Sequence, residues 1–86
     1  MKTYVLIVAH PKSDQQQIAC RLKKVEEVKE INEVVGFVNL MVEIETESLA
    51  QVSEVVARIR KDCDVAMTFS LVAVYPVKRR KRRDKP

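Results

Sequence analysis

The chain has 86 residues, of which 47% are hydrophobic, and a formal net charge of +4 at pH 7. This length predicts one domain. The apolar run at residues 4–9 ends at Pro11, too short for a signal peptide, and far from the roughly 20 residues of a membrane span. Cys20 and Cys63 lack metal-type spacing and are too few for a disulfide scaffold. We therefore expect a reduced, cytoplasmic protein without membrane contact, bound metal or cofactor.

The first predicted strand covers residues 3–9, which are apolar on both faces of the strand. Such a strand lies in the middle of a sheet that is covered on both sides. Ser13 and Gln16 then form a capping-box pattern, with Ser13 as the N-cap. Apolar residues at helical spacing follow, so we expect a helix that runs to about Lys24.

Two further strands flank Gly36, the only glycine of the chain. Residues 28–35 carry interspersed charges, as an edge strand often does. Residues 38–46 alternate, which places Leu40, Val42 and Ile44 on one face. The glycine predicts a tight turn between these strands. Because glycine permits close approach of backbone to a ligand, the turn at 36–39 is the leading candidate for a functional site.

The second half of the chain repeats the pattern of strand, helix and strand. Ser48 and Gln51 form another capping box, and apolar residues at helical spacing predict a helix to about Lys61. The last strand is predicted over 65–75, with Phe69 and Leu71 facing one way. Pro76 ends it.

The predicted order βαββαβ is typical of the α+β, ferredoxin-like fold. It implies a four-stranded antiparallel sheet in the order 4-1-3-2, with both helices on one face. Strands 1 and 4 are apolar on both faces, and no residues remain to cover the second face. Packing two such sheets face to face covers it. We therefore predict a homodimer that forms a dimeric α+β barrel, and we expect such dimers to assemble into rings.

Four segments resemble one known family. They are residues 4–8 (YVLIV), 27–31 (EVKEI), 35–40 (VGFVNL) and 65–70 (VAMTFS). The chain resembles the RAM domain, the effector-binding half of Lrp/AsnC transcription factors. The resemblance covers about residues 3–75 and lacks the helix-turn-helix domain that precedes it in the full regulators. The chain is thus similar to a stand-alone RAM protein.

The resemblance implies a ligand site. Family members carry Gly-x-Tyr-Asp-Leu at the turn and Thr-x-Thr in the fourth strand, and these line a crevice between dimers where a free amino acid binds. The corresponding residues here are Gly36, Val38, Asn39, Thr68 and Ser70. Val38 replaces the aromatic residue. Asn39 replaces the aspartate, so its amide oxygen can accept from an ammonium group but lacks the charge that strengthens such a bond.

Each of these residues also has a purely structural interpretation. Gly36 can simply supply the positive φ of a hairpin, and Asn39 can be a turn residue. Thr68 and Ser70 share one strand face, and paired hydroxyls there often reflect β-propensity alone. The leading hypothesis is a non-enzymatic effector-sensing and oligomerisation module. By the resemblance, it pairs with Lrp/AsnC-type regulators.

The basic charge is concentrated at the C-terminus. Residues 78–86 have a net charge of +6 and residues 1–77 a net charge of −2, which predicts a folded domain over 1–76 and a disordered tail over 77–86. One alternative function is nonspecific binding of nucleic acid; a solubilising tail is the other interpretation. The six consecutive basic residues are Lys78, Arg79, Arg80, Lys81, Arg82 and Arg83.

His10, the only histidine, supports a third hypothesis. In a small dimeric α+β-barrel enzyme a histidine at a strand end can act as general base. The sequence places no aspartate or glutamate beside it, and no second histidine activates Cys20 or Cys63 as a nucleophile. We therefore expect no catalytic residue.

Overall fold

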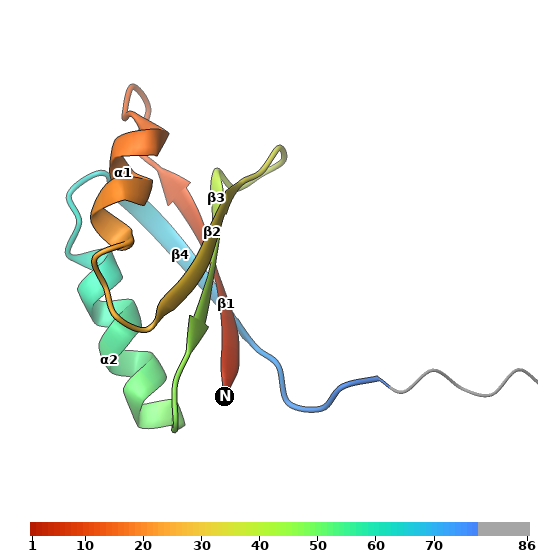
Figure 1. The fold of residues 1–86 in the computed structure, drawn as a ribbon. Coiled ribbons are helices and arrows are strands. Elements are labelled where there is room, and N and C mark those ends of the chain that lie inside the picture. Colours follow the sequence, from red (N-terminus) through yellow and green to blue (C-terminus); the bar gives the residue numbers. More distant parts are fainter. Residues whose placement is uncertain (78–86) are drawn as a thin grey trace, which may run out of the picture.

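The computed structural model describes residues 1–77, which form one four-stranded antiparallel sheet and two helices (Figure 1). The sheet order is β2-β3-β1-β4, the predicted order 4-1-3-2 read from the opposite edge. The ferredoxin-like α+β fold is thus confirmed. The predicted tail residues 78–83 lie outside the described part. The elements are β1 (Lys2–Ala9), α1 (Gln15–Leu22), β2 (Val28–Glu33), β3 (Leu40–Glu45), α2 (Leu49–Arg60) and β4 (Val65–Val72).

Both helices begin at side-chain caps. In α2 the predicted cap is confirmed, because Gln51 N–H donates to Ser48 Oγ at 3.2 Å. In α1 the predicted cap is wrong. Asp14, not Ser13, accepts from the backbone N–H of Gln16 at 2.9 Å, while Ser13 N–H closes a turn onto the His10 carbonyl. A carboxylate at the N-cap also interacts favourably with the helix dipole, which explains the shift.

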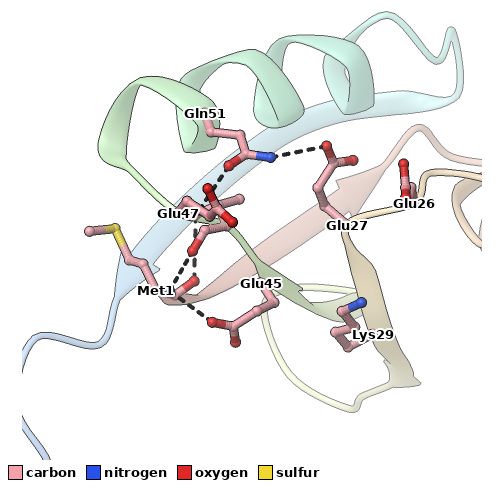
Figure 2. A pocket seen from close by; sticks show the side chains of 8 residues that line it. Met1, Glu26, Glu27, Lys29, Glu45, Glu47 and Gln51 are labelled. Atoms are coloured by element: carbon pink, nitrogen blue, oxygen red, sulfur yellow. Dashed lines mark hydrogen bonds and ion pairs between the residues drawn. The ribbon is translucent and has the colours of Figure 1, made fainter.

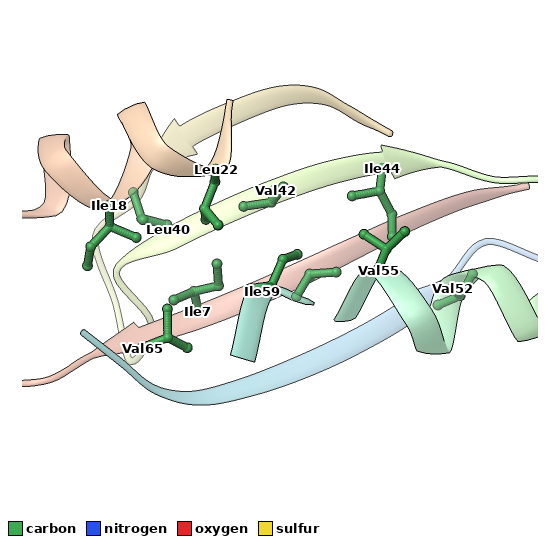
Figure 3. Close-up of a cluster of buried hydrophobic side chains, with 11 residues drawn as sticks. Ile7, Ile18, Leu22, Leu40, Val42, Ile44, Val52, Val55, Ile59 and Val65 are labelled. Carbon is green, nitrogen blue, oxygen red and sulfur yellow. The ribbon is translucent and has the colours of Figure 1, made fainter. Parts of the chain in front are cut away.

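The hydrophobic core lies between the helices and one face of the sheet (Figure 3). Alternate residues of β1 and β3 point towards the helices, and each helix presents its apolar stripe in return. No helix among residues 1–77 is long and apolar enough to cross a membrane. The core residues, all less than 10% exposed, are Val5, Ile7, Ile18, Leu22, Leu40, Val42, Ile44, Val52, Val55, Ile59 and Val65.

The other face of the sheet carries no helix (Figure 1), and its β1 and β4 side chains are largely apolar. The pairing of β1 with β4 sets Val8 against Met67, Leu6 against Phe69 and Tyr4 against Leu71. The β4 side chains are the most accessible, with Met67 52%, Phe69 42% and Leu71 56% exposed. Large contiguous apolar surface of this kind marks an interaction site. Glu43, which pairs with Tyr4 and lies 3.7 Å from Lys2 Nζ, borders this apolar surface on β3. We call the apolar surface the open face; it consists of Tyr4, Leu6, Val8, Met41, Met67, Phe69 and Leu71.

The strands that flank Gly36 are shorter than predicted. β2 ends at Glu33 and β3 begins at Leu40, so residues 34–39 form a loop instead of a tight turn. The Val34 N–H donates to the Asn39 carbonyl at 3.1 Å and closes this loop. β4 ends at Val72 instead of the predicted Tyr75, because β1 begins at Lys2, whose carbonyl accepts one more hydrogen bond, from the Ala73 N–H.

Candidate functional site

Asn39 holds the β2–β3 loop, residues 34–39, against the end of β1. Its backbone N–H donates to the Ile7 carbonyl at 2.8 Å. Its side-chain Oδ1 accepts from the Ala9 N–H at 2.7 Å. The amide oxygen that the sequence analysis assigned to a ligand ammonium group therefore already has one backbone donor. An amide oxygen has two lone pairs, so Oδ1 keeps one for a ligand, and Nδ2 carries two donors.

The rest of the β2–β3 loop reaches the open face. Gly36 has φ +150°, and no heavy atom lies within 4 Å of the position that a Cβ would occupy, so a side chain is disfavoured there by conformation rather than by space. Val38 is buried at 6% exposure. Phe37 is 77% exposed and packs edge-to-face on Phe69, with ring centroids 6.0 Å apart. Phe37 was not predicted, because strand alternation does not extend into a loop.

The two predicted hydroxyls lie on the helix side of the sheet. Thr68 pairs with Ile7 and Ser70 with Val5, and both partners belong to the core face. Thr68 is half-buried, whereas Ser70 is exposed and lines a groove of about 330 Å³ beside α2, which also includes Ser53 and Arg60. Within one chain the hydroxyls therefore point away from the face that Phe37 reaches. A ligand crevice between dimers that uses all five predicted residues remains a prediction.

A polar pocket of about 580 Å³ lies at the opposite end of the sheet (Figure 2). We call it the acidic pocket; it includes Glu26, Glu27, Glu45 and Glu47. The Met1 ammonium group donates to Glu45 Oε2 at 2.7 Å, and this hydrogen bond lowers the pKa of Glu45. It also donates to the Thr46 carbonyl. The sequence analysis missed the pocket because its residues come from distant segments.

Within the acidic pocket, the Glu27 carboxylate accepts hydrogen bonds from two side chains, Gln51 and Arg58. Its own backbone N–H lowers the pKa of its carboxyl group, and hydrogen bonds from Arg58 and Gln51 lower it further. Arg58 Nη2 lies 2.8 Å from Glu27 Oε1. Lys29 and the Met1 ammonium group also line the pocket, so its four carboxylates outnumber two cationic groups. Among residues 1–77, Glu26 and Glu47 make no ion pair within 4 Å, which leaves negative charge for a cationic partner.

His10 lies near a second charged cluster, at the start of β4. The backbone N–H of His10 donates to the backbone carbonyl of Asp64 at 2.9 Å, so Asp64 neighbours His10 through the main chain. The carboxylates, however, bind Arg21: Nε lies 2.8 Å from Asp62 Oδ2 and Nη2 lies 2.7 Å from Asp64 Oδ2. These hydrogen bonds lower the pKa of Asp62. Neither carboxylate is free to orient the exposed imidazole, because the Arg21 guanidinium already neutralises both.

Comparison with known proteins extends these observations. A family model described as the Lrp/AsnC ligand binding domain matches residues 2–83. No curated protein matches the chain.

Solved structures match the whole fold. FFRP-DM1 is 27% identical, with 85% of this chain and 97% of that chain covered and a TM-score of 0.78. A hypothetical protein from Pyrococcus horikoshii is 26% identical, with coverages of 87% and 90% and a TM-score of 0.74. A transcriptional regulator from Neisseria meningitidis, solved as a complex with L-Met, is 15% identical, with a TM-score of 0.74. The match covers 91% of this chain and 52% of the regulator, and at that identity it shows the fold alone.

Proposed function

This chain belongs to the family of Lrp/AsnC ligand-binding domains, and from that premise we propose that it is a non-enzymatic, cytoplasmic effector-sensing and oligomerisation module. It forms homodimers and rings of dimers, and binds a free amino acid or a related small metabolite between the dimers. It pairs with transcription regulators of the same family and changes their assembly. The mechanism is a higher affinity of the ligand for one assembly state than for another.

The open face of the sheet is the observation that carries this proposal. Its three β4 side chains, Met67, Phe69 and Leu71, are each between 42% and 56% exposed, although they are large and apolar. Two sheets that pack face to face lie about 10 Å apart and cover such side chains mutually. A second copy of the chain offers the matching apolar face, because an isologous interface uses the same patch on both subunits.

The β2–β3 loop supports an amino acid as the ligand class. Asn39 retains an acceptor lone pair on Oδ1 and two donors on Nδ2, which suit the ammonium and carboxylate groups of a free amino acid. The loop lies at the edge of the open face, where Phe37 contacts Phe69, so assembly brings loops of neighbouring subunits closer. The Neisseria regulator that was solved with L-Met has the same fold and supports the same ligand class.

A thermal-shift screen with the twenty amino acids tests the proposal. We expect one amino acid, or a chemically related group, to raise the melting temperature by the mass-action stabilisation of a ligand that binds the folded state. The shift should shrink in Thr68→Val, which removes a hydroxyl at nearly constant volume. Ser13→Ala, which removes a hydroxyl that is not among the five predicted site residues, is the control. A flat response to all twenty amino acids would remove the proposed ligand class.

A second candidate function is nonspecific nucleic-acid binding through the basic residues 78–83. The observation that favours it is the segregation of charge, with +6 on residues 78–86 and −2 on residues 1–77. Binding should fall steeply with salt, because each neutralised phosphate releases counterions. A gel shift compares the full chain with one that ends at Tyr75. Binding that survives in the shortened chain would contradict this function.

His10 offers the weakest alternative, a small α+β-barrel enzyme. Its imidazole is exposed, and the nearby carboxylates of Asp62 and Asp64 bind Arg21. We expect His10→Ala to keep the amino-acid response of the full chain. Loss of that response in a folded His10→Ala protein would give His10 a role that the proposal denies.

A further inference from the structure

An apolar groove of about 550 Å³ lies where β1 begins and β4 ends. It is lined by Met1, Leu49, Val72, Ala73 and Val74. Leu49, the first residue of α2, is 61% exposed, and Val74 is 70% exposed. Leucine and valine side chains as accessible as these favour contact with a further apolar surface.

The chain that follows β4 is itself apolar and uncovered. Val74 still lines the groove of its own subunit, so we call residues 75–77 (YPV) the C-terminal arm. Ala73 N–H donates to the Lys2 carbonyl at 2.9 Å and attaches the chain just before the arm to the sheet. Beyond it, Tyr75 is 84% and Val77 97% exposed. Figure 1 shows the arm leaving the sheet on the side opposite the helices, which is the side of the open face.

Charge complementarity identifies the occupant of the groove. The groove adjoins the acidic pocket, because Met1 lines both (Figure 2). The arm is followed by six consecutive basic residues, 78–83. The surface thus offers an apolar region beside an acidic one, and the C-terminal segment offers an apolar stretch followed by a basic one.

We propose that residues 75–83 of one subunit dock on a second copy of the chain, with the arm in the apolar groove and the basic residues along the acidic pocket. The proposal rests on the homodimer of the proposed function, because the arm leads towards the side where the second copy packs. An extended arm spans about 10 Å, and the six basic residues add about 20 Å, enough to cross both regions. The exchange is reciprocal, so a two-fold axis covers both grooves and closes the assembly.

Photo-crosslinking of the full chain tests the docking. Tyr75 is replaced by photoreactive benzoylphenylalanine, and equal amounts of ¹⁴N- and ¹⁵N-labelled protein are mixed before irradiation. We expect cross-links from position 75 to peptides that contain Met1 or Leu49, with half of the pairs of mixed isotope. The control places the same photoreactive residue at Val35, which is as exposed as Tyr75 but lies in the β2–β3 loop, and should give no cross-link to Leu49.

The outcomes separate this proposal from the homodimer. Cross-links only between peptides of one isotope would mean that the arm folds onto its own groove, which overturns the exchange. Dimers in light scattering without cross-links to Met1 or Leu49 would overturn the docking and leave the dimer standing. Monomers would remove both.

A separate variant tests whether the carboxylates of the acidic pocket attract the basic residues 78–83. Glu26→Gln combined with Glu47→Gln neutralises two carboxylates of the acidic pocket that have no ion-pair partner among residues 1–77. We expect the cross-link yield at low salt to fall several-fold, and its dependence on salt to weaken, because screening then has fewer charges to act on. A yield and a salt dependence equal to those of the unaltered pocket would overturn the assignment of residues 78–83 to this pocket.

Discussion

Replacing Leu71, which lies on the edge strand β4, with alanine removes apolar surface from the open face. Burying a whole leucine side chain contributes about 1.5–3 kcal/mol. Leu71 is 56% exposed, so association can still gain about 1 kcal/mol from it. A two-fold interface uses the residue twice, and the change should therefore cost about 2 kcal/mol, or a dissociation constant raised roughly 30-fold.

Sedimentation equilibrium over a range of concentrations measures this constant, because the monomer of 9.9 kDa and the dimer differ twofold in mass. Leu71→Met is the matched control: it keeps nearly the same apolar volume and should leave the constant within a few-fold of the original. Leu71→Lys places a charge on the face and should give monomers. If Leu71→Ala dimerises as tightly as the unaltered chain, the open face is not the interface.

Three further predictions concern the fold and the loop. Asn39→Ala leaves the Ala9 N–H without its acceptor and should lower the free energy of unfolding by about 1–3 kcal/mol in urea denaturation. Asn39→Asp keeps the acceptor and adds a negative charge, so this variant should bind an amino acid more tightly in calorimetry. Hydrogen bonds from Arg21 lower the pKa of Asp62, so this pair stabilises the fold at pH values above the ordinary aspartate pKa near 4. The stabilisation is lost as the pH falls through the lowered pKa. Arg21→Gln should therefore make the free energy of unfolding depend less on pH in this range. Ile59→Ala opens a cavity beneath α2 and should lower the free energy of unfolding by about 2–5 kcal/mol, measured by thermal denaturation. An unchanged free energy of unfolding would mean that the core repacks around the smaller side chain.

The fold was largely predictable because its signals are local and periodic. Leu40, Val42 and Ile44 alternate along β3 and all three are buried, as period two requires. The sheet order followed from the βαββαβ order of elements. The ends of elements were less predictable, since they depend on competition between neighbours: Asp14 capped α1 in place of Ser13, and β4 ended near the first residues of its neighbour β1.

The candidate site was predictable only in part. The single glycine pointed to Gly36, and the family resemblance pointed to Asn39, but the bond from Ala9 N–H to Asn39 Oδ1 joins residues thirty positions apart, which no local pattern encodes. Phe37 was missed because its partner Phe69 lies two strands away across the sheet. The acidic pocket was missed for the same reason, since its carboxylates come from two separate segments.

Native mass spectrometry in the presence of the twenty amino acids tests the central claim most directly. The account predicts assemblies with an even number of 9.9 kDa subunits that carry one kind of amino acid as a bound adduct. Single subunits without an adduct, at concentrations of tens of micromolar, would contradict it.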